Sequence, residues 1–200
     1  MTGVQTCALR SQASLQDHEA EYKDSVENPE AFWERVAKEL DWSKPWDKVF
    51  EWNYPTFKWF LGGKCNITSN ALDRHLTNGN KNKAAFIFLG EDGSERVVTY
   101  GRLAQMVNRF SNGLKSLEVK KGDRVVIYMP LSLEGAIAML ACARIGAVHS
   151  VVYAGFSVGS LRGRILDAQA KVVITADVGY RRGNEVRPEE HTSEPQSPTK

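Results

Sequence analysis

Three short apolar runs, each of strand length, constrain the fold of this chain more than any other feature of its sequence. They comprise residues 124–129, 148–153 and 171–176. About 20 to 25 residues separate the start of one run from the next, and the segments between them have apolar residues at helical spacing. Parallel strands need a crossover of about this length, usually a helix. The sequence therefore predicts an α/β fold in which helices flank a parallel βαβαβ sheet.

Turn and capping residues mark the ends of the other predicted elements. Two apolar runs, 84–89 and 95–99, flank a glycine-containing turn and predict a β-hairpin. Thr99 and Ser157 are typical helix N-caps, and Gly146 is typical of the residue after a helix, here the one predicted over 132–145. The helix expected after Thr99 has an apolar face made of Leu103, Met106, Val107, Phe110, Leu114 and Leu117. The helix expected after Ser157 has an apolar face made of Val158, Leu161, Ile165 and Ala168.

An aromatic-rich segment precedes the sheet. A short amphipathic helix is expected to begin near Pro29. The aromatic residues that follow are Trp42, Trp46, Phe50, Trp52, Tyr54, Phe57, Trp59 and Phe60. Aromatics interleaved with lysines can stack on single-stranded nucleic acid, but acidic residues match the lysines here. The favoured interpretation is that the aromatics anchor an irregular segment onto the sheet domain.

Composition excludes several function classes. A net charge of +2, without a long basic block, argues against a charge-driven nucleic-acid or membrane surface. No apolar run approaches the roughly 20 residues that span a bilayer. The three cysteines, Cys7, Cys65 and Cys142, are widely spaced and without metal-ligand spacing, so we expect a reducing, cytoplasmic setting and no metal site.

Several residues of reactive types are expected to have structural and not catalytic roles. Ser69, Asp73 and His75 fall on one predicted short helix, with Ser69 or Asn70 as its cap. They would point in different directions, so we expect capping and local hydrogen bonds and no catalytic triad. Cys142 is expected to be a buried hydrophobe, and His149 a satisfied core histidine.

Three loops should share the carboxyl ends of the parallel strands, where ligands of open sheets gather. They are residues 130–132, 154–157 and 177–184. Gly155 allows a ligand to approach the backbone, and Ser157 opens a helix N-terminus, a combination that suits anions. Arg181 and Arg182 offer donors that match phosphate oxygens. On spacing alone, phosphate binding and a solvated surface both stay open.

Three separated motifs resemble one family. They are Trp59-Phe-Leu-Gly-Gly-Lys-Cys-Asn-Ile-Thr-Ser-Asn-Ala-Leu-Asp-Arg-His75, His149-Ser-Val-Val-Tyr-Ala-Gly-Phe-Ser157 and Val173-Ile-Thr-Ala-Asp-Val-Gly-Tyr-Arg-Arg-Gly183. Their wording and order resemble the AMP-forming acetyl-CoA synthetases, acetate–CoA ligases of the adenylate-forming acyl-CoA synthetase superfamily. The resemblance extends from about residue 30 to residue 187.

The resemblance implies a two-step reaction and only part of one binding site. Acetate attacks ATP to give acetyl-adenylate and pyrophosphate, and the CoA thiol then displaces AMP, with magnesium accompanying ATP. Tyr153, Ala154 and Gly155 match the family turn that lies against the CoA nucleotide. Arg181 matches an arginine that contacts CoA phosphate, and Arg182 is a further candidate. No catalytic residue and no metal ligand of the family falls within this chain.

Two positions depart from the family pattern. Ala154 stands where many members have a second glycine, and Asn184 stands where some have a basic residue.

The resemblance also divides the chain into segments. We expect an acetyl-CoA synthetase-like N-terminal segment over 17–83 and the start of an AMP-dependent synthetase/ligase domain over 84–187. Residues 1–16 and 188–200 resemble translated sequencing-adapter sequence or a disordered leader and tail.

The phosphate loop, the acyl pocket and the C-terminal catalytic lysine of the family are not found in this sequence. The sequence therefore predicts an N-terminal fragment of an acetate–CoA ligase that is inactive alone. A propionyl-CoA or other short-chain acyl-CoA synthetase is the alternative within the family. A non-catalytic α/β module that binds CoA or a nucleotide is the alternative outside it. Acetate, ATP and CoA are the implied partners, without nucleic acid or membrane.

Overall fold

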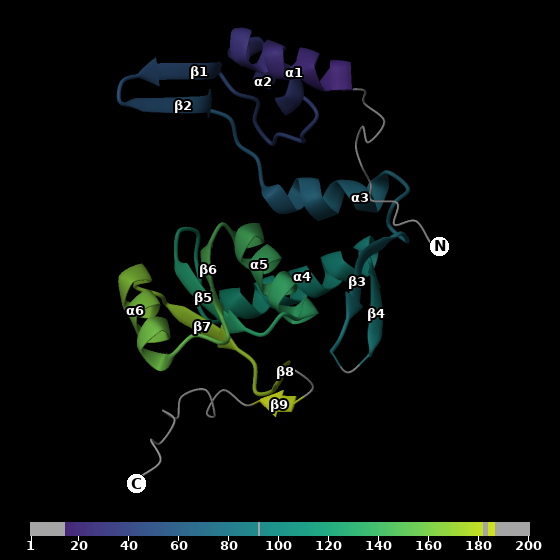
Figure 1. Ribbon diagram of the computed structural model, residues 1–200, viewed down its shortest axis with the longest axis vertical. Helices are drawn as coiled ribbons and strands as arrows, with labels where there is room; N and C mark the ends of the chain where they lie inside the picture. The colour runs from purple at the N-terminus through teal and green to yellow at the C-terminus, as the bar shows by residue number, and fades with distance from the viewer. Residues whose placement is uncertain (1–14, 92, 182–183, 187–200) are drawn as a thin grey trace. The chain divides into compact units, whose positions relative to one another are not determined.

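A computed structural model describes residues 15–91, 93–181 and 184–186 (Figure 1). The chain divides into two units, Met1–Cys65 and Asn66–Lys200, which are described separately below. Among the described residues, no helix is both long and apolar enough to cross a bilayer.

The first unit contains two helices and a two-stranded antiparallel ribbon. Helix α1 is Leu15–Glu27 and helix α2 is Pro29–Ala37, with Pro29 in its first turn as predicted. Strands β1, Lys48–Asn53, and β2, Thr56–Leu61, pair so that Phe50 lies opposite Trp59. The aromatic segment is therefore regular, and the prediction of an irregular segment is wrong.

The aromatic side chains of this ribbon pack on one another. The Phe50 and Trp59 rings lie 4.4 Å apart, and Trp52 stacks on Phe57 at 6.2 Å across the two strands. Such cross-strand aromatic pairs stabilise an antiparallel ribbon. Their expected role as anchors on the sheet domain stays a prediction.

The second unit begins with a helical segment and a hairpin. The π-helical turn η1, Ser69–Asp73, continues into α3, Arg74–Thr77. Its N-cap is Thr68, without a side-chain cap bond, so the cap predicted at Ser69 or Asn70 is wrong. Strands β3, Ala84–Leu89, and β4, Glu95–Thr99, form the predicted hairpin.

Helix α4, Tyr100–Ser116, follows this hairpin, and most residues of its predicted apolar face pack in the core. Thr99 caps it as predicted, because its Oγ1 accepts a hydrogen bond from the Arg102 amide at 3.2 Å. Leu103, Val107 and Leu114 are buried. Leu117 lies beyond the last turn and is exposed, so its predicted place in the core is wrong.

The centre of the second unit is the predicted parallel sheet. Strands β5, Arg124–Met129, β6, Val148–Tyr153, and β7, Val172–Thr175, pair in the order β6-β5-β7. Helix α5, Leu133–Ile145, connects β5 to β6, and helix α6, Val158–Ala168, connects β6 to β7. Because the two crossovers run in opposite directions along the sheet, right-handed connections place these helices on opposite faces.

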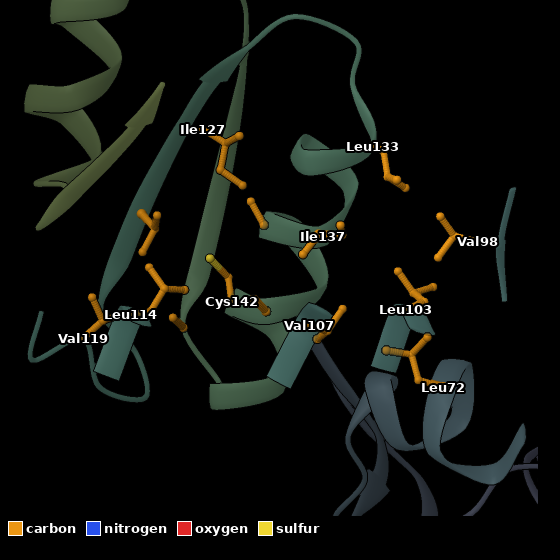
Figure 2. Packing of buried hydrophobic residues seen from close by; sticks show 14 residues of the cluster. Leu72, Val98, Leu103, Val107, Leu114, Val119, Ile127, Leu133, Ile137 and Cys142 are labelled. Carbon is orange, nitrogen blue, oxygen red and sulfur yellow. The ribbon is translucent and has the colours of Figure 1, made fainter. Parts of the chain in front are cut away.

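The packing agrees with this arrangement. On one face of β5, Val125 and Ile127 share a core with α4 and α5 (Figure 2). On the other face, Val126 and Tyr128 pack with Leu161 of α6 and with further apolar residues. Alternate side chains of β5 therefore pack on opposite faces of the sheet, and both faces of this strand are buried, as expected of a doubly wound fold.

Two sequence predictions of buried residues are wrong. His149 lies on β6, which pairs only with β5 among the described residues, and it is exposed and not in the core. Val158 is also exposed, at 44%, because Leu161 and Ile165 supply the contact of α6 with the sheet. Cys142 is fully buried, as predicted.

Candidate functional site

The three predicted loops do follow the carboxyl ends of β5, β6 and β7; together they are called the carboxyl rim below. The first is residues 130–132 and the second residues 154–157, as expected. The third differs from the prediction, since part of it is strand and not loop. It contains strand β8, Gly179–Arg181, which pairs antiparallel with β9, Asn184–Val186.

The second rim loop is tied to the central strand by Tyr128. Its hydroxyl donates to the carbonyl oxygens of Ala154 at 2.8 Å and Phe156 at 3.2 Å. Burial raises the pKa of Tyr128 above its usual value, which keeps the hydroxyl a donor. The turn that contains Gly155 is thus held at two points by β5.

Gly155 lies close to the Tyr153 ring within this turn. A Cβ atom at this position would lie 2.5 Å from Cε1 of the Tyr153 ring, closer than real Cβ atoms come. Tyr153 and Gly155 are exposed, whereas Ala154 is half-buried and packs on the cluster of Val126, Tyr128 and Val152. The structure therefore brings Tyr153, Ala154 and Gly155 together on an accessible edge.

Helix α6 begins directly after this turn. The Ser157 hydroxyl caps it as predicted, accepting from the Ser160 amide at 3.4 Å. The Arg164 guanidinium lies 4.7 Å from the centre of the Phe156 ring, and the rings of Phe156 and Tyr153 meet edge to face at 6.0 Å. Arg164 also donates to the Ser160 side chain. A helix N-terminus, a cation and exposed aromatic surface thus meet here.

Arg164 was not among the predicted site residues, although its guanidinium lies over the Phe156 ring. Phe156 precedes α6 and is not part of the helix, so no helical spacing relates it to Arg164, and their contact required the structure.

The first and third rim loops adjoin. A Cβ atom at Gly179 would lie 3.1 Å from Cγ of Pro130. Arg181 ends β8, two residues after Gly179, and its backbone is placed opposite Asn184. The side chain of Arg181 and the whole of Arg182 lie outside the described residues. Their contact with phosphate, and the pairing of Arg181 with Gly155 across the rim, stay predictions.

The other reactive residues do not form a site. Asp73 makes an ion pair with Arg144 at 2.8 Å, while His75 lies within hydrogen-bond distance of Asn78 and Asn80. The Asp73 contact is long-range, so the predicted local hydrogen bonding is wrong for this residue, and the expected absence of a catalytic triad stays a prediction. The described residues bring together no group of three potential metal ligands among His, Cys, Asp and Glu.

Two family models match adjoining parts of the chain. Residues 18–71 match the family described as the acetyl-coenzyme A synthetase N-terminus. Residues 72–199 match the AMP-binding enzyme family. Together the matches cover both structural units.

Individual proteins agree with these matches. Acetyl-coenzyme A synthetase of Deinococcus radiodurans is 51% identical over 176 residues, which are 88% of this chain and 27% of that protein. 3-Hydroxypropionyl-coenzyme A synthetase of Sulfurisphaera tokodaii is 50% identical over 183 residues, which are 90% of this chain and 28% of that protein. The structure of acetoacetyl-CoA synthetase from Streptomyces lividans is similar with a TM-score of 0.78 at 26% identity, over 84% of this chain and 26% of that one.

The chain thus spans about a quarter of the length of the proteins it matches. It belongs to the AMP-binding enzyme family, and it corresponds to the N-terminal region of the acetyl-coenzyme A synthetases.

Proposed function

We propose that this chain is the N-terminal part of an AMP-forming acetate–CoA ligase. The reaction joins acetate to AMP with release of pyrophosphate, and the CoA thiol then replaces AMP to give acetyl-CoA. The observation that carries the proposal is the pair of adjoining family matches, which follow each other in family order over residues 18–199. A relative that is 51% identical over 176 residues is named acetyl-coenzyme A synthetase, which makes acetate the first carboxylate to test.

In this proposal the carboxyl rim is one wall of the CoA site. Tyr153, Ala154 and Gly155 offer an accessible turn to the nucleotide of CoA, and Arg181 and Arg182 bind its phosphates. Exposed aromatic surface beside a helix N-terminus and a guanidinium suits a ligand with both a base and phosphates. ATP and magnesium would be held by residues outside the described part of this chain.

A second candidate concerns the acyl group. The relative from Sulfurisphaera tokodaii, named for 3-hydroxypropionyl-CoA, is about as similar to this chain as the acetyl-coenzyme A synthetase is. Similarity in this region therefore does not separate two-carbon from three-carbon acids. Propionate and 3-hydroxypropionate are the alternative substrates to test.

A chimera tests the proposal directly. The matched segment of the Deinococcus radiodurans enzyme is replaced by residues 18–186 of this chain, and acetyl-CoA formation from acetate, ATP and CoA is measured. We expect acetyl-CoA formation. The acyl pocket of the chimera comes from the Deinococcus radiodurans enzyme, so the chimera tests the ligase role of this chain and not its acyl group. A folded chimera that forms no acyl-CoA, while the unmodified enzyme does, contradicts the proposal.

The 200-residue chain itself is expected to form no acyl-adenylate from acetate and ATP. Acetate-dependent ATP–pyrophosphate exchange by the purified chain would overturn this expectation. Titration of the chain with CoA, with Arg181→Ala as the comparison, separates a binding module from a segment that binds only within a longer protein.

A further inference from the structure

The segment before α3 holds the far end of helix α5. The side-chain amide of Asn66 donates to the carbonyl oxygens of Ala143 at 3.1 Å and Arg144 at 3.2 Å, in the last turn of α5. Its Oδ1 accepts from the amide of Thr68 at 2.9 Å and from the Thr68 hydroxyl at 2.7 Å. Asn66 thus donates to two carbonyls of the last turn of α5, one of which, that of Ala143, also accepts from the Gly146 amide, and its own orientation is fixed.

The segment before α3 makes a second polar contact with helix α5. Asp73 Oδ1 lies 2.8 Å from Nη2 of Arg144, whose side chain is only 19% exposed. Leu72, between the two contacts in sequence, is 1% exposed and belongs to the core shared with α4 and α5. The segment is therefore anchored by packing as well as by polar contacts.

Helix α5 leads from this anchor to the carboxyl rim. Its 13 residues span about 20 Å at the usual rise, and its N-cap Ser132 accepts from the Gly135 amide at 3.1 Å. Pro130 lies two residues before that cap. A shift of α5 along its axis would therefore be passed to Pro130.

Pro130 in turn lies against the third rim loop. Gly179 has no Cβ atom, and one placed there would come within 3.1 Å of Pro130 Cγ. Strand β8 begins at Gly179 and ends at Arg181. The contact with Pro130 therefore lies at the base of the short strand that carries the proposed CoA arginine.

We propose that Asn66 and Asp73 are positioning residues for the third rim loop and act on it through helix α5. Only the test that measures the KM for CoA rests on the proposed function. It joins the two family matches, because Asn66 lies in the acetyl-coenzyme A synthetase N-terminus match while α5 and the rim lie in the AMP-binding match. The N-terminal segment would then contribute to the CoA site without touching the ligand.

A second ion pair provides a matched control at the same, amino end of the parallel strands, away from the carboxyl rim. Asp123 pairs with Lys171 at 3.2 Å, where β5 and β7 begin, and both side chains are partly exposed. If the contacts of α5 act on stability alone, Asp73→Asn and Asp123→Asn should have the same kind of effect. If they position the rim, only Asp73→Asn should change it.

Hydrogen exchange of the 200-residue chain tests the coupling without any activity. In Asp73→Asn we expect the amides of residues 131–135 and 177–181 to exchange roughly fivefold faster, and in Asp123→Asn to exchange as in the unaltered chain. Arg144→Lys, which keeps the charge but shortens the reach, is expected to give the same pattern if Asp73→Asn does not fold. Unchanged rim exchange in a folded Asp73→Asn or Arg144→Lys chain, or equal acceleration by Asp123→Asn, overturns the proposal.

The chimera adds a functional readout. We expect Asp73→Asn to raise the KM for CoA roughly fivefold and to leave acetate-dependent ATP–pyrophosphate exchange unchanged. An active chimera in which Asp73→Asn leaves the KM for CoA unchanged contradicts the positioning role. A chimera without acetyl-CoA formation contradicts the proposed function instead, and the exchange experiment still decides the inference.

Discussion

Cys142 is the described residue whose chemistry is altered most by its surroundings. It has no exposed surface, and burial raises the pKa of its thiol from the usual 9.0 to about 11. Between these values the unfolded chain loses the thiol proton while the folded chain keeps it. The stability that the neutral thiol contributes is fully present below about pH 9 and is lost as the pH rises toward 11.

We therefore expect the free energy of unfolding to fall by up to about 1.4 kcal/mol per pH unit between pH 9 and 11. Urea unfolding across this range measures it, and Cys142→Ala should remove this part of the slope. Equal slopes in the two chains would show that Cys142 does not titrate differently on folding. In the folded chain, the exposed Cys65 should react with a thiol reagent and Cys142 should not.

Two glycines give opposite predictions at the scale of the helix. Gly146 ends α5 with φ +74°, and a Cβ atom there would lie 2.9 Å from Lys121 Cγ. Gly113 lies within α4, and no atom lies within 4 Å of a Cβ placed on it. We expect Gly146→Ala to lower the free energy of unfolding by about 1 to 2 kcal/mol and Gly113→Ala to raise it by about 0.5 to 1 kcal/mol. Chemical denaturation of both variants checks this, and a stabilised Gly146→Ala would contradict the assigned helix end.

The sequence was most informative where local chemistry fixes an element. Thr99 and Ser157 predicted the starts of α4 and α6, because a side-chain oxygen satisfies a free amide in the first turn. The three parallel strands were predictable from their spacing, since a helical crossover of that length allows few alternatives. Their common direction also placed the three loops on one rim.

Other elements depend on partners that local sequence does not specify. The sequence predicts an irregular aromatic segment, because the cross-strand pairs that stabilise its two strands, such as Phe50 with Trp59, cannot be read from local sequence. It also predicts a core position for His149, because a central and an edge strand have the same apolar pattern. Its exposure follows only from the strand order.

The site was predictable in part for the same reason. The turn from Tyr153 to Gly155 follows a strand end, and topology alone places it on the rim. The contacts of Asn66 and Asp73 with α5 join residues more than 70 positions apart. No spacing rule relates such residues, so this link required the structure.

At the scale of the whole molecule, both outer strands of the parallel sheet have a free edge among the described residues. Strands β6 and β7 each pair only with β5, and Val151 on β6 is 54% exposed. Free edges with exposed apolar side chains favour association between copies. We expect the 200-residue chain to self-associate in sedimentation velocity experiments.

Val151→Lys should shift the 200-residue chain toward the monomer, because a lysine on an edge strand opposes pairing. Asn108→Lys, on the exposed face of α4, adds the same charge away from the edge and should not. A monomeric unaltered chain, or equal effects of the two substitutions, would show that the β6 edge is not the surface responsible.

The central claim is that the carboxyl rim of this chain forms one wall of a CoA site in an acetate–CoA ligase. The most direct test compares Arg181→Ala with Arg162→Ala, an exposed arginine on α6, in the Deinococcus radiodurans chimera. Loss of a charged hydrogen bond to phosphate should raise the KM for CoA about tenfold in Arg181→Ala, and acetate-dependent ATP–pyrophosphate exchange should stay unchanged. A KM for CoA equal to that of Arg162→Ala would contradict the account.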